Sequence, residues 1–155
     1  METSTMQKNI SPKPILGIIE TVSFPELGIV EVMAKIDTGA YSGALHCEEI
    51  DEIVHPVSGK KALKIRPIDS THDEVIIEKF ARVYTTSSSG HRLQRYVIQT
   101  PIIVQEQEYM IRIGITKRDM MNMKVLIGRR FLRRNNMLVD VTVNQEFDND
   151  GGRKL

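Results

Sequence analysis

The stretch "AKIDTGAYSGALHC", from Ala34 to Cys47, places an acidic residue directly after an apolar run and follows it with a turn. Between Ile29 and Ile36 apolar side chains recur at every second position, which is the period of a half-buried strand. Asp37 therefore stands at the end of a strand, and Gly39 lets the chain turn. An aspartate in this position is most simply a turn former or a cap. A catalytic carboxylate is the alternative.

The composition predicts a single soluble domain. The chain has 155 residues, enough for one core, and its net charge of +1 gives no reason to expect a nucleic acid or a membrane as partner. Cys47 is the only cysteine, which excludes an internal disulfide and fits a reducing compartment. No stretch reaches the roughly 20 apolar residues that span a bilayer. We therefore expect a cytoplasmic protein, although a chain whose export signal had been removed would show the same pattern.

Turn signals recur along the chain and separate short runs with strand character. We expect a loose arm over 1–14, one domain over 15–147 and a frayed tail over 148–155. A hairpin should close near Ser58-Gly59, and a longer one around the polar tip "TTSSSG" at 85–90. Further strands are predicted at 15–22, 29–36, 107–116, 123–128 and 138–147, with one short helix at 129–137. This order predicts a small closed barrel or a sandwich.

Two fragments, "IDTGA" at 36–40 and "VLIGR" at 125–129, together resemble the retropepsin-type aspartic peptidases. The resemblance implies that the Asp loop is threaded past the apolar-apolar-Gly segment. Gly128 would let two backbones approach closely, and the predicted helix follows it as that fold requires. The fold class we expect is thus all-β, a closed retropepsin-like (acid protease) barrel with one short C-terminal helix.

A longer ordered set of motifs narrows the resemblance. "DTGAYSGALHC", "SSSG" at 87–90, "ITKRDMMNMKVLIGRRFL" and "LVD" at 138–140 follow one another over residues 15–143. In this order they are similar to the bacterial family named ATP-dependent zinc proteases. Members of that family are retropepsin-like domains associated with ATP-grasp glutamate ligases, so the resemblance implies a ligase of this kind as a partner.

The resemblance also implies a chemistry, because aspartic peptidases hydrolyse amides with two carboxylates that share one proton. This chain has one Asp-Thr-Gly, so a dyad needs Asp37 from each of two chains at the axis of a homodimer. Thr38 would hydrogen-bond across that axis, Gly39 would approach the substrate backbone, and Ala40 would leave room beside it. We expect an aspartic-type peptidase that hydrolyses peptide or isopeptide bonds. The alternative is a non-catalytic module that holds a peptide or a partner in the same cleft.

Other residues are predicted to support this site, and one position near it differs from the families that the chain resembles. Small polar residues make a mobile hairpin end, so Ser87, Ser88, Ser89 and Gly90 are candidates for a flap. Retroviral enzymes carry an acid where this chain has Tyr41, and the bacterial family carries an arginine there. Arg129, which pairs with that acid in the viral fold, must therefore find another partner, near Asp140 or on a neighbouring chain.

Metal and nucleotide sites have little support. His46, Cys47, Glu48 and His55 are the only cluster with ligand chemistry, and they match no zinc motif. We interpret them as one core cysteine and one surface histidine, and we expect no metal and no cofactor. A metal-dependent hydrolase using these residues is a further hypothesis. No phosphate-binding loop is present, so any ATP would be bound by a partner ligase.

Arginines gather at two places. The segment "GRRFLRR" at 128–134 carries four, and Arg92 and Arg95 follow the predicted flap tip. Since the rest of the chain is not basic, nucleic acid binding is not expected, and either a solvated helix face or carboxylate recognition remains. Arginine binds carboxylates bidentately, so a substrate of acidic peptide character would fit a cleft lined by such residues.

Overall fold

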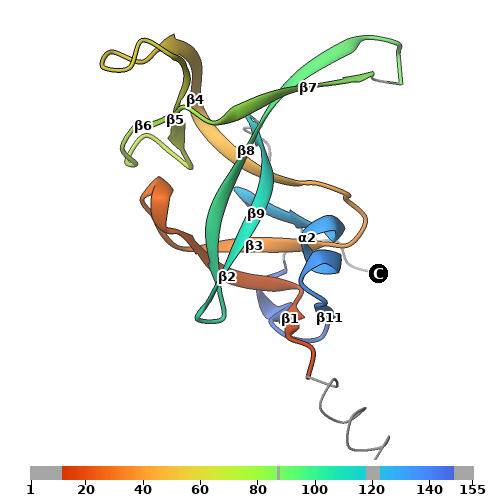
Figure 1. Cartoon of the computed structure of the whole chain (residues 1–155). Coiled ribbons are helices and arrows are strands. Elements are labelled where there is room, and N and C mark those ends of the chain that lie inside the picture. Colours follow the sequence, from red (N-terminus) through yellow and green to blue (C-terminus); the bar gives the residue numbers. More distant parts are fainter. Residues whose placement is uncertain (1–11, 87, 118–122, 149–155) are drawn as a thin grey trace, which may run out of the picture.

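The structure is a computed structural model, and it describes residues 12–86, 88–117 and 123–148 (Figure 1). The described chain is built almost entirely from strands. They are β1 (Ile15–Gly17), β2 (Ile19–Phe24), β3 (Ile29–Asp37), β4 (Gly43–Val54), β5 (Lys61–Pro67), β6 (Val75–Ile77), β7 (Phe80–Thr86), β8 (Arg92–Val104), β9 (Gln107–Thr116), β10 (Val125–Gly128) and β11 (Leu138–Asp140). The helix α2 (Arg129–Arg134) and the 3-10 turns η1 (Pro25–Leu27) and η2 (Gln145–Phe147) complete the described elements.

Six strands close into a barrel in the order β10–β3–β2–β8–β9–β4, and β4 pairs back to β10. The strand β10 closes the ring because it lies parallel to β3 on one side and antiparallel to β4 on the other. Outside the ring, β5 and β6 extend the sheet from β4, and β7 pairs with β8. The expected all-β closed barrel with one short helix after its last barrel strand is confirmed.

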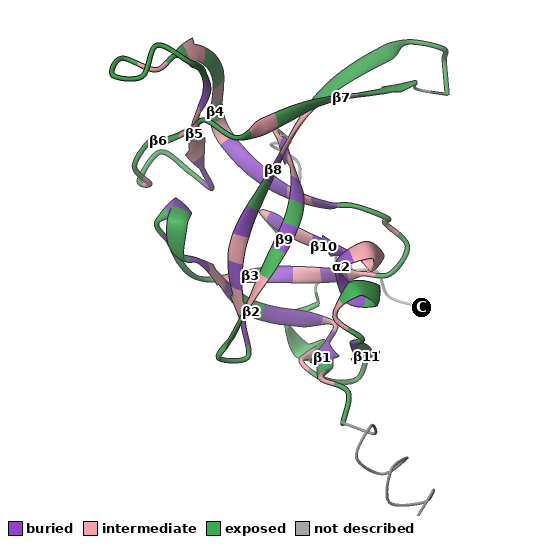
Figure 2. Ribbon diagram, viewed as in Figure 1, coloured by how far each residue is buried: buried purple, intermediate pink, exposed green. Residues whose placement is uncertain are grey.

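The alternation of apolar residues explains how the strands face the core. In β9, Ile111, Ile113 and Ile115 are buried, whereas Met110 before them and Arg112 between the first two are exposed. Each fully buried isoleucine contributes about 1.5–3 kcal/mol relative to an exposed one. Figure 2 shows buried residues along the barrel strands and mainly exposed ones along the outer part of the β7–β8 hairpin.

Two predicted strands were wrong in extent. The strand expected over 15–22 is split at Ile18 into β1 and β2, because β1 pairs with β11 while β2 pairs with β3 and β8. Ile18 forms the corner: its N–H donates to the Val143 carbonyl at 3.0 Å and its carbonyl accepts from the Ile36 N–H at 2.9 Å. The strand expected over 138–147 ends at Asp140, whose carboxylate binds the Thr142 backbone N–H at 2.9 Å and starts a turn.

Other expectations from the sequence are met. The hairpin near Ser58-Gly59 is present, with the His55 N–H donating to the Lys60 carbonyl at 2.7 Å and Gly59 at a φ of 73°. The strand expected at 107–116 is β9. Most of the expected arm and tail, at 1–11 and 149–155, lies outside the described residues, so the division into arm, domain and tail stays a prediction. No helix among the described residues has the length and apolar character needed to cross a membrane.

Candidate active site

Asp37 is the last residue of β3 and stands opposite Gly128 in the parallel ladder between β3 and β10. Its carboxylate Oδ1 accepts a hydrogen bond from the Gly39 N–H at 2.9 Å, and its carbonyl accepts one from the Ala40 N–H at 3.2 Å. The Asp side chain therefore closes a turn on its own backbone, as the simpler interpretation of the sequence predicted. The residue is partly exposed at the rim of the barrel, so its carboxylate remains accessible.

Gly128 is needed because two backbones meet at this point. A methyl group on Gly128 would lie 2.6 Å from the carbonyl oxygen of Tyr41 and 2.7 Å from the carbonyl carbon of Ser42. Its φ of −89° and ψ of 174° are open to any residue. A glycine is therefore required here because β10 lies so close to residues 41–42, and not because the backbone adopts an unusual conformation. This is the threading that the resemblance implied.

Arg129 holds the Asp loop from behind. Its Nη1 donates to the Gly39 carbonyl at 3.1 Å, and its backbone N–H donates to the Ala40 carbonyl at 2.8 Å. The guanidinium carbon lies 5.4 Å from the centre of the Tyr41 ring, which is the range of a cation–π contact. The partner expected near Asp140 is not found among the described contacts of Arg129, which instead meets Tyr41, the residue that replaces the viral acid; a partner on a neighbouring chain stays a prediction.

Thr38 is exposed beside a hollow of about 540 Å³ on the surface of the molecule. The other walls of this hollow come from α2 and β11 and include Arg129, Leu132, Leu138 and Val139. The hollow is thus continuous with the Asp loop through Thr38. The roles expected for Thr38, Gly39 and Ala40 toward a second chain and a substrate stay predictions.

The β7–β8 hairpin carries the predicted flap. Ser88, Ser89 and Gly90 lie between the two strands, with Gly90 at a φ of 85°, whereas Ser87 lies outside the described residues. Figure 1 shows the hairpin projecting from the barrel toward the side on which the loop between β3 and β4 lies. Near the tip, the Arg92 guanidinium stacks 4.1 Å from the centre of the Tyr84 ring. Closure of this hairpin over Asp37 stays a prediction.

The interpretation of His46 as a surface residue was wrong, because both His46 and Cys47 are fully buried. His46 is flanked by two segments distant in the sequence, since its N–H donates to the Lys124 carbonyl at 2.8 Å and its carbonyl accepts the Ile68 N–H at 2.9 Å. Burial raises the pKa of the Cys47 thiol to about 12. His55 lies elsewhere, in the β4–β5 hairpin, where its Nδ1 accepts the Val57 N–H at 3.1 Å.

Metal-ligating side chains do not gather in the described part of the chain. Across residues 12–86, 88–117 and 123–148, no three His, Cys, Asp or Glu side chains lie together as a metal ion would need. Within the cluster considered from the sequence, His46 Nε2 contacts Glu48 Oε2 at 3.3 Å. A metal-dependent hydrolase built on these residues therefore has no support in the described geometry.

A comparison with known protein families shows to which family the chain belongs. The family whose sequence model matches residues 15–147 is described as "Retropepsin-like aspartic endopeptidase RimB". The chain belongs to the RimB-like family. This confirms the retropepsin-type resemblance, and the match covers the domain that carries both the Asp loop and Gly128 in this RimB-like chain.

Relatives of this RimB-like chain include longer proteins. A "Probable alpha-L-glutamate ligase" from Desulfotalea psychrophila is 30% identical over 135 residues, covering 80% of this chain and 27% of that protein. A protein of the same name from Shewanella pealeana is 28% identical over 132 residues, covering 83% of this chain and 28% of that protein. The chain thus spans about a quarter of the length of these relatives, and their name bears out the association with glutamate ligases.

A solved structure shares the fold. The crystal structure of a protein of unknown function (DUF785) from Legionella pneumophila matches with a TM-score of 0.69 and 24% identity. It covers 85% of this RimB-like chain and 96% of the other. Two relationships were not predicted from the sequence: Tyr41 as the partner of Arg129, and Arg112 as a neighbour of α2. The aromatic residue beside "DTGA" was the only available signal for the first, and no local pattern points to the second.

Proposed function

We propose that this RimB-like chain is one half of an aspartic-type peptidase that hydrolyses peptide or isopeptide bonds with a dyad of two Asp37 residues in a homodimer. The observation that carries the proposal is the fixed and accessible Asp37 carboxylate. Its Oδ1 accepts the Gly39 N–H at 2.9 Å, and no other described residue donates to it. Gly128 and Arg129 hold the loop from behind, which leaves the carboxylate free to meet water and a second carboxyl group.

The chemistry follows from one proton shared between two carboxyl groups. The ionised Asp37 takes a proton from a water molecule as the water oxygen attacks the carbonyl carbon of the substrate. The protonated Asp37 gives its proton to the carbonyl oxygen, and a tetrahedral intermediate forms. When the carbon–nitrogen bond breaks, the first carboxyl group passes its proton to the leaving amine, and a hydroxyl of the intermediate returns a proton to the other Asp37 as the new carbonyl forms. The Gly39 N–H keeps the carboxylate oriented through these steps.

Apolar surface near the loop supports the homodimer. Ile15 on β1 is 54% exposed, Leu138 on β11 is 49% exposed and Val141 just after it is 62% exposed. Thr38 and Leu138 line the same hollow, Ile15 pairs with Leu138 in the ladder between β1 and β11, and Val141 follows three residues later. A second copy that covers this surface would bring its own Asp37 toward the axis, as an isologous interface requires.

The substrate we propose is an acidic peptide, and the partner an ATP-grasp glutamate ligase. The name of the relatives refers to ligation of glutamate, and a hydrolase that accompanies such a ligase would act on a glutamate-bearing product. Arg92 and Arg95 on the proposed flap would face the carboxylates of that product. A cytoplasmic location is part of the proposal, because the free Cys47 suits a reducing compartment.

Asp37→Asn tests the mechanism, because it keeps the shape of the side chain and removes the ionisable group. We expect a folded dimer without hydrolysis of peptides that the unmodified chain cuts. Asp51→Asn is the matched control, since Asp51 is an exposed acid in β4 without an ion pair among the described residues, and it should keep full activity. Hydrolysis that continues undiminished in Asp37→Asn would rule out the proposed mechanism.

Mixing experiments separate a shared site from a single-chain site. When equal amounts of the unmodified chain and Asp37→Asn exchange subunits, only about a quarter of the dimers carry two Asp37 residues. The activity per unmodified chain should then fall by about half. A chain that stays monomeric and binds acidic peptides without cutting them would instead identify the non-catalytic binding module.

A further inference from the structure

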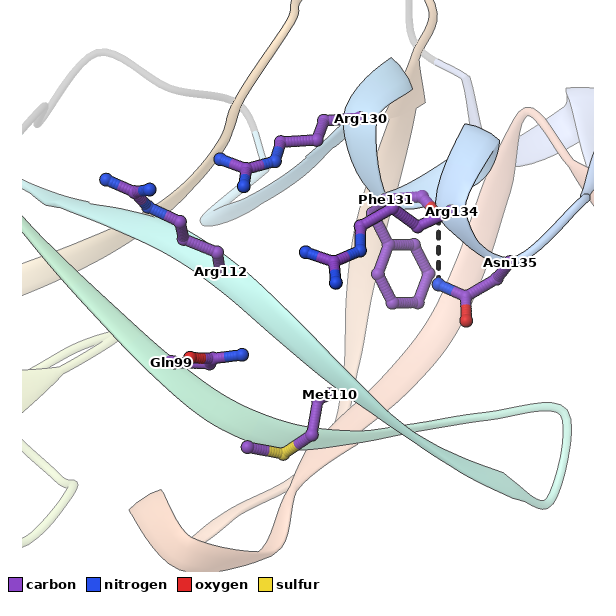
Figure 3. Close-up of a pocket in the computed structure, with 7 residues that line it drawn as sticks. All are labelled: Gln99, Met110, Arg112, Arg130, Phe131, Arg134 and Asn135. Atoms are coloured by element: carbon purple, nitrogen blue, oxygen red, sulfur yellow. Dashed lines mark hydrogen bonds between the residues drawn. The ribbon is translucent and has the colours of Figure 1, made fainter.

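Three arginines line one hollow on the outer face of the barrel. Arg112 comes from β9, and Arg130 and Arg134 come from successive turns of α2. Figure 3 shows their guanidinium groups arranged around one space, above Gln99 and Met110. The hollow has a volume of about 270 Å³, and no residue of the loop 37–42 lines it. We call Arg112, Arg130 and Arg134 the arginine pocket.

These arginines have no acidic partner within the described parts of the chain. Other arginines of the same protein are paired: Arg66 contacts Glu49 at 3.0 Å and Glu74 at 2.8 Å, and Arg82 contacts Glu52. Like charges that converge without a counter-charge repel one another, so their placement stabilises the fold only when an anion lies between them. The charge pattern of the arginine pocket is therefore that of a binding site for a negatively charged group.

The shape of the site favours an extended ligand. A second hollow of about 450 Å³ shares Gln99 and Arg112 with the arginine pocket and continues along β7 to Lys79. The one acid on its wall, Glu78, already accepts the Ser58 hydroxyl at 2.7 Å. Two adjoining hollows with four cationic residues suit successive carboxylates along a chain better than one small ion.

The residues that line the arginine pocket indicate which kind of extended ligand it would bind. Met110 and Phe131 supply apolar surface beside the arginines, and Gln99 supplies an amide. Such walls match the methylene groups and backbone of a glutamate- or aspartate-rich peptide. A nucleic acid would need a broader basic surface, whereas the whole chain carries a net charge of only +1.

We infer that the arginine pocket is a second binding site, separate from the Asp37 cleft, that docks an acidic segment of a peptide through bidentate arginine–carboxylate contacts. The inference deepens the proposed function, because a peptide long enough to reach both places would be held at the pocket while another part of it enters the cleft. A short peptide would occupy only one of the two places at a time. The pocket would thus select substrates by their length and acidity.

A binding assay tests this without any need for catalysis. The full chain carrying Asp37→Asn is titrated into a fluorescent hexaglutamate peptide, and into a hexaglutamine peptide as the uncharged comparison. We expect binding of hexaglutamate alone. Adding Arg112→Gln, Arg130→Gln and Arg134→Gln should raise the Kd by about tenfold or more, since three exposed ion pairs are lost.

A charge-matched variant separates a site from general attraction. Lys13→Gln, Lys60→Gln and Lys61→Gln remove three exposed charges away from the pocket, so both triple variants lower the net charge by three, from +2 in the Asp37→Asn parent to −1. We expect the lysine variant to bind hexaglutamate within about twofold of its parent. Equal losses of affinity for hexaglutamate in both triple variants, or no loss in either, would overturn the inference. Binding of an oligonucleotide or of pyrophosphate at the three arginines, without binding of hexaglutamate, would overturn it as well.

Kinetics distinguish the two proposals from each other. With Asp37 intact, the arginine variant should raise KM for long acidic peptides and leave kcat and the cleavage of short peptides unchanged. Arginine-dependent binding without any hydrolysis would uphold the pocket and reject the peptidase. Asp37-dependent hydrolysis with an unchanged KM in the arginine variant would reject the pocket and uphold the peptidase.

Discussion

Gly128→Ala is the substitution that best tests how the backbone around Gly128 supports the Asp loop. If only backbone conformation mattered, alanine would stabilise the protein by about 0.4–1 kcal/mol, because it restricts the unfolded chain. The φ of −89° at Gly128 permits that gain. The surroundings oppose it, since the added methyl group would lie 2.6 Å from the Tyr41 carbonyl oxygen and 2.7 Å from the Ser42 carbonyl carbon. Both are backbone atoms, so no side chain can turn away to make room.

The magnitude follows from these contacts. Overpacking against fixed atoms costs about 1–3 kcal/mol. Relief requires β10 and residues 41–42 to separate, which lengthens the bonds from the Arg129 N–H to the Ala40 carbonyl, now 2.8 Å, and from the Arg130 N–H to the Tyr41 carbonyl, now 3.0 Å. Each contributes about 0.5–1.5 kcal/mol. We expect a net loss of about 3 kcal/mol in the free energy of unfolding, together with loss of any Asp37-dependent activity.

Urea denaturation followed by far-ultraviolet circular dichroism measures the change, at one fixed chain concentration because a dimer would make stability depend on it. Gly28→Ala is the control: Gly28 has a φ of 67° and open space around it. It should cost about 1 kcal/mol from conformation alone. A Gly128→Ala chain as stable as the unmodified one, or less affected than Gly28→Ala, would refute the close-approach argument.

Two further predictions concern groups with shifted pKa values. Burial raises the pKa of Cys47 to about 12. Iodoacetamide at pH 8 should therefore leave the folded chain unmodified, whereas it should alkylate one thiol per chain when the chain is unfolded in urea. Rapid labelling of the folded chain would contradict the buried position. Hydrogen bonds from the Thr71 hydroxyl, from His72 and from the Thr71 N–H lower the pKa of Asp69 to about 2. The resulting stabilisation is complete above the pKa of about 3.9 that Asp69 has in the unfolded chain, and it is lost as the pH falls toward 2. The difference in the free energy of unfolding between the unmodified chain and Asp69→Asn should therefore shrink between pH 5 and pH 2. A difference that stays constant in urea titrations over this range would show that these hydrogen bonds do not cause the stabilisation.

Strands with a regular pattern could be predicted from sequence, and so could the ring closure. In β9 the alternation of Ile111, Ile113 and Ile115 with exposed residues settles both the type and the facing of the strand. The approach of Gly128 to the Asp loop was predicted from the resemblance of "IDTGA" and "VLIGR" to the retropepsin-type fold, since no pattern within the apolar run itself names the partner of this glycine.

The errors have physical causes that no local pattern reports. Residues 15–22 look like one strand, but β1 pairs with β11 at the other end of the chain. After Asp140 the residues still alternate, yet the Asp140 carboxylate binds the hydroxyl of Thr142 at 2.6 Å and competes with the ladder. An Asp two residues before a Thr was the available signal for this turn. The buried His46 forms backbone hydrogen bonds with Lys124 and Ile68, which are distant in the sequence, and strand alternation cannot show such neighbours.

The closing of the barrel by β10 has a consequence for the timing of synthesis. Arg129 and Gly39, which meet in the Asp loop, are 90 positions apart in the sequence. A ribosome makes the Asp37 loop long before it makes the strand that supports it, and contacts this distant form late in folding. Until β10 emerges and enters between β3 and β4, the loop has neither Gly128 behind it nor Arg129 on its carbonyl groups. A growing chain would therefore carry Asp37 on an unsupported loop until nearly the whole domain has been made.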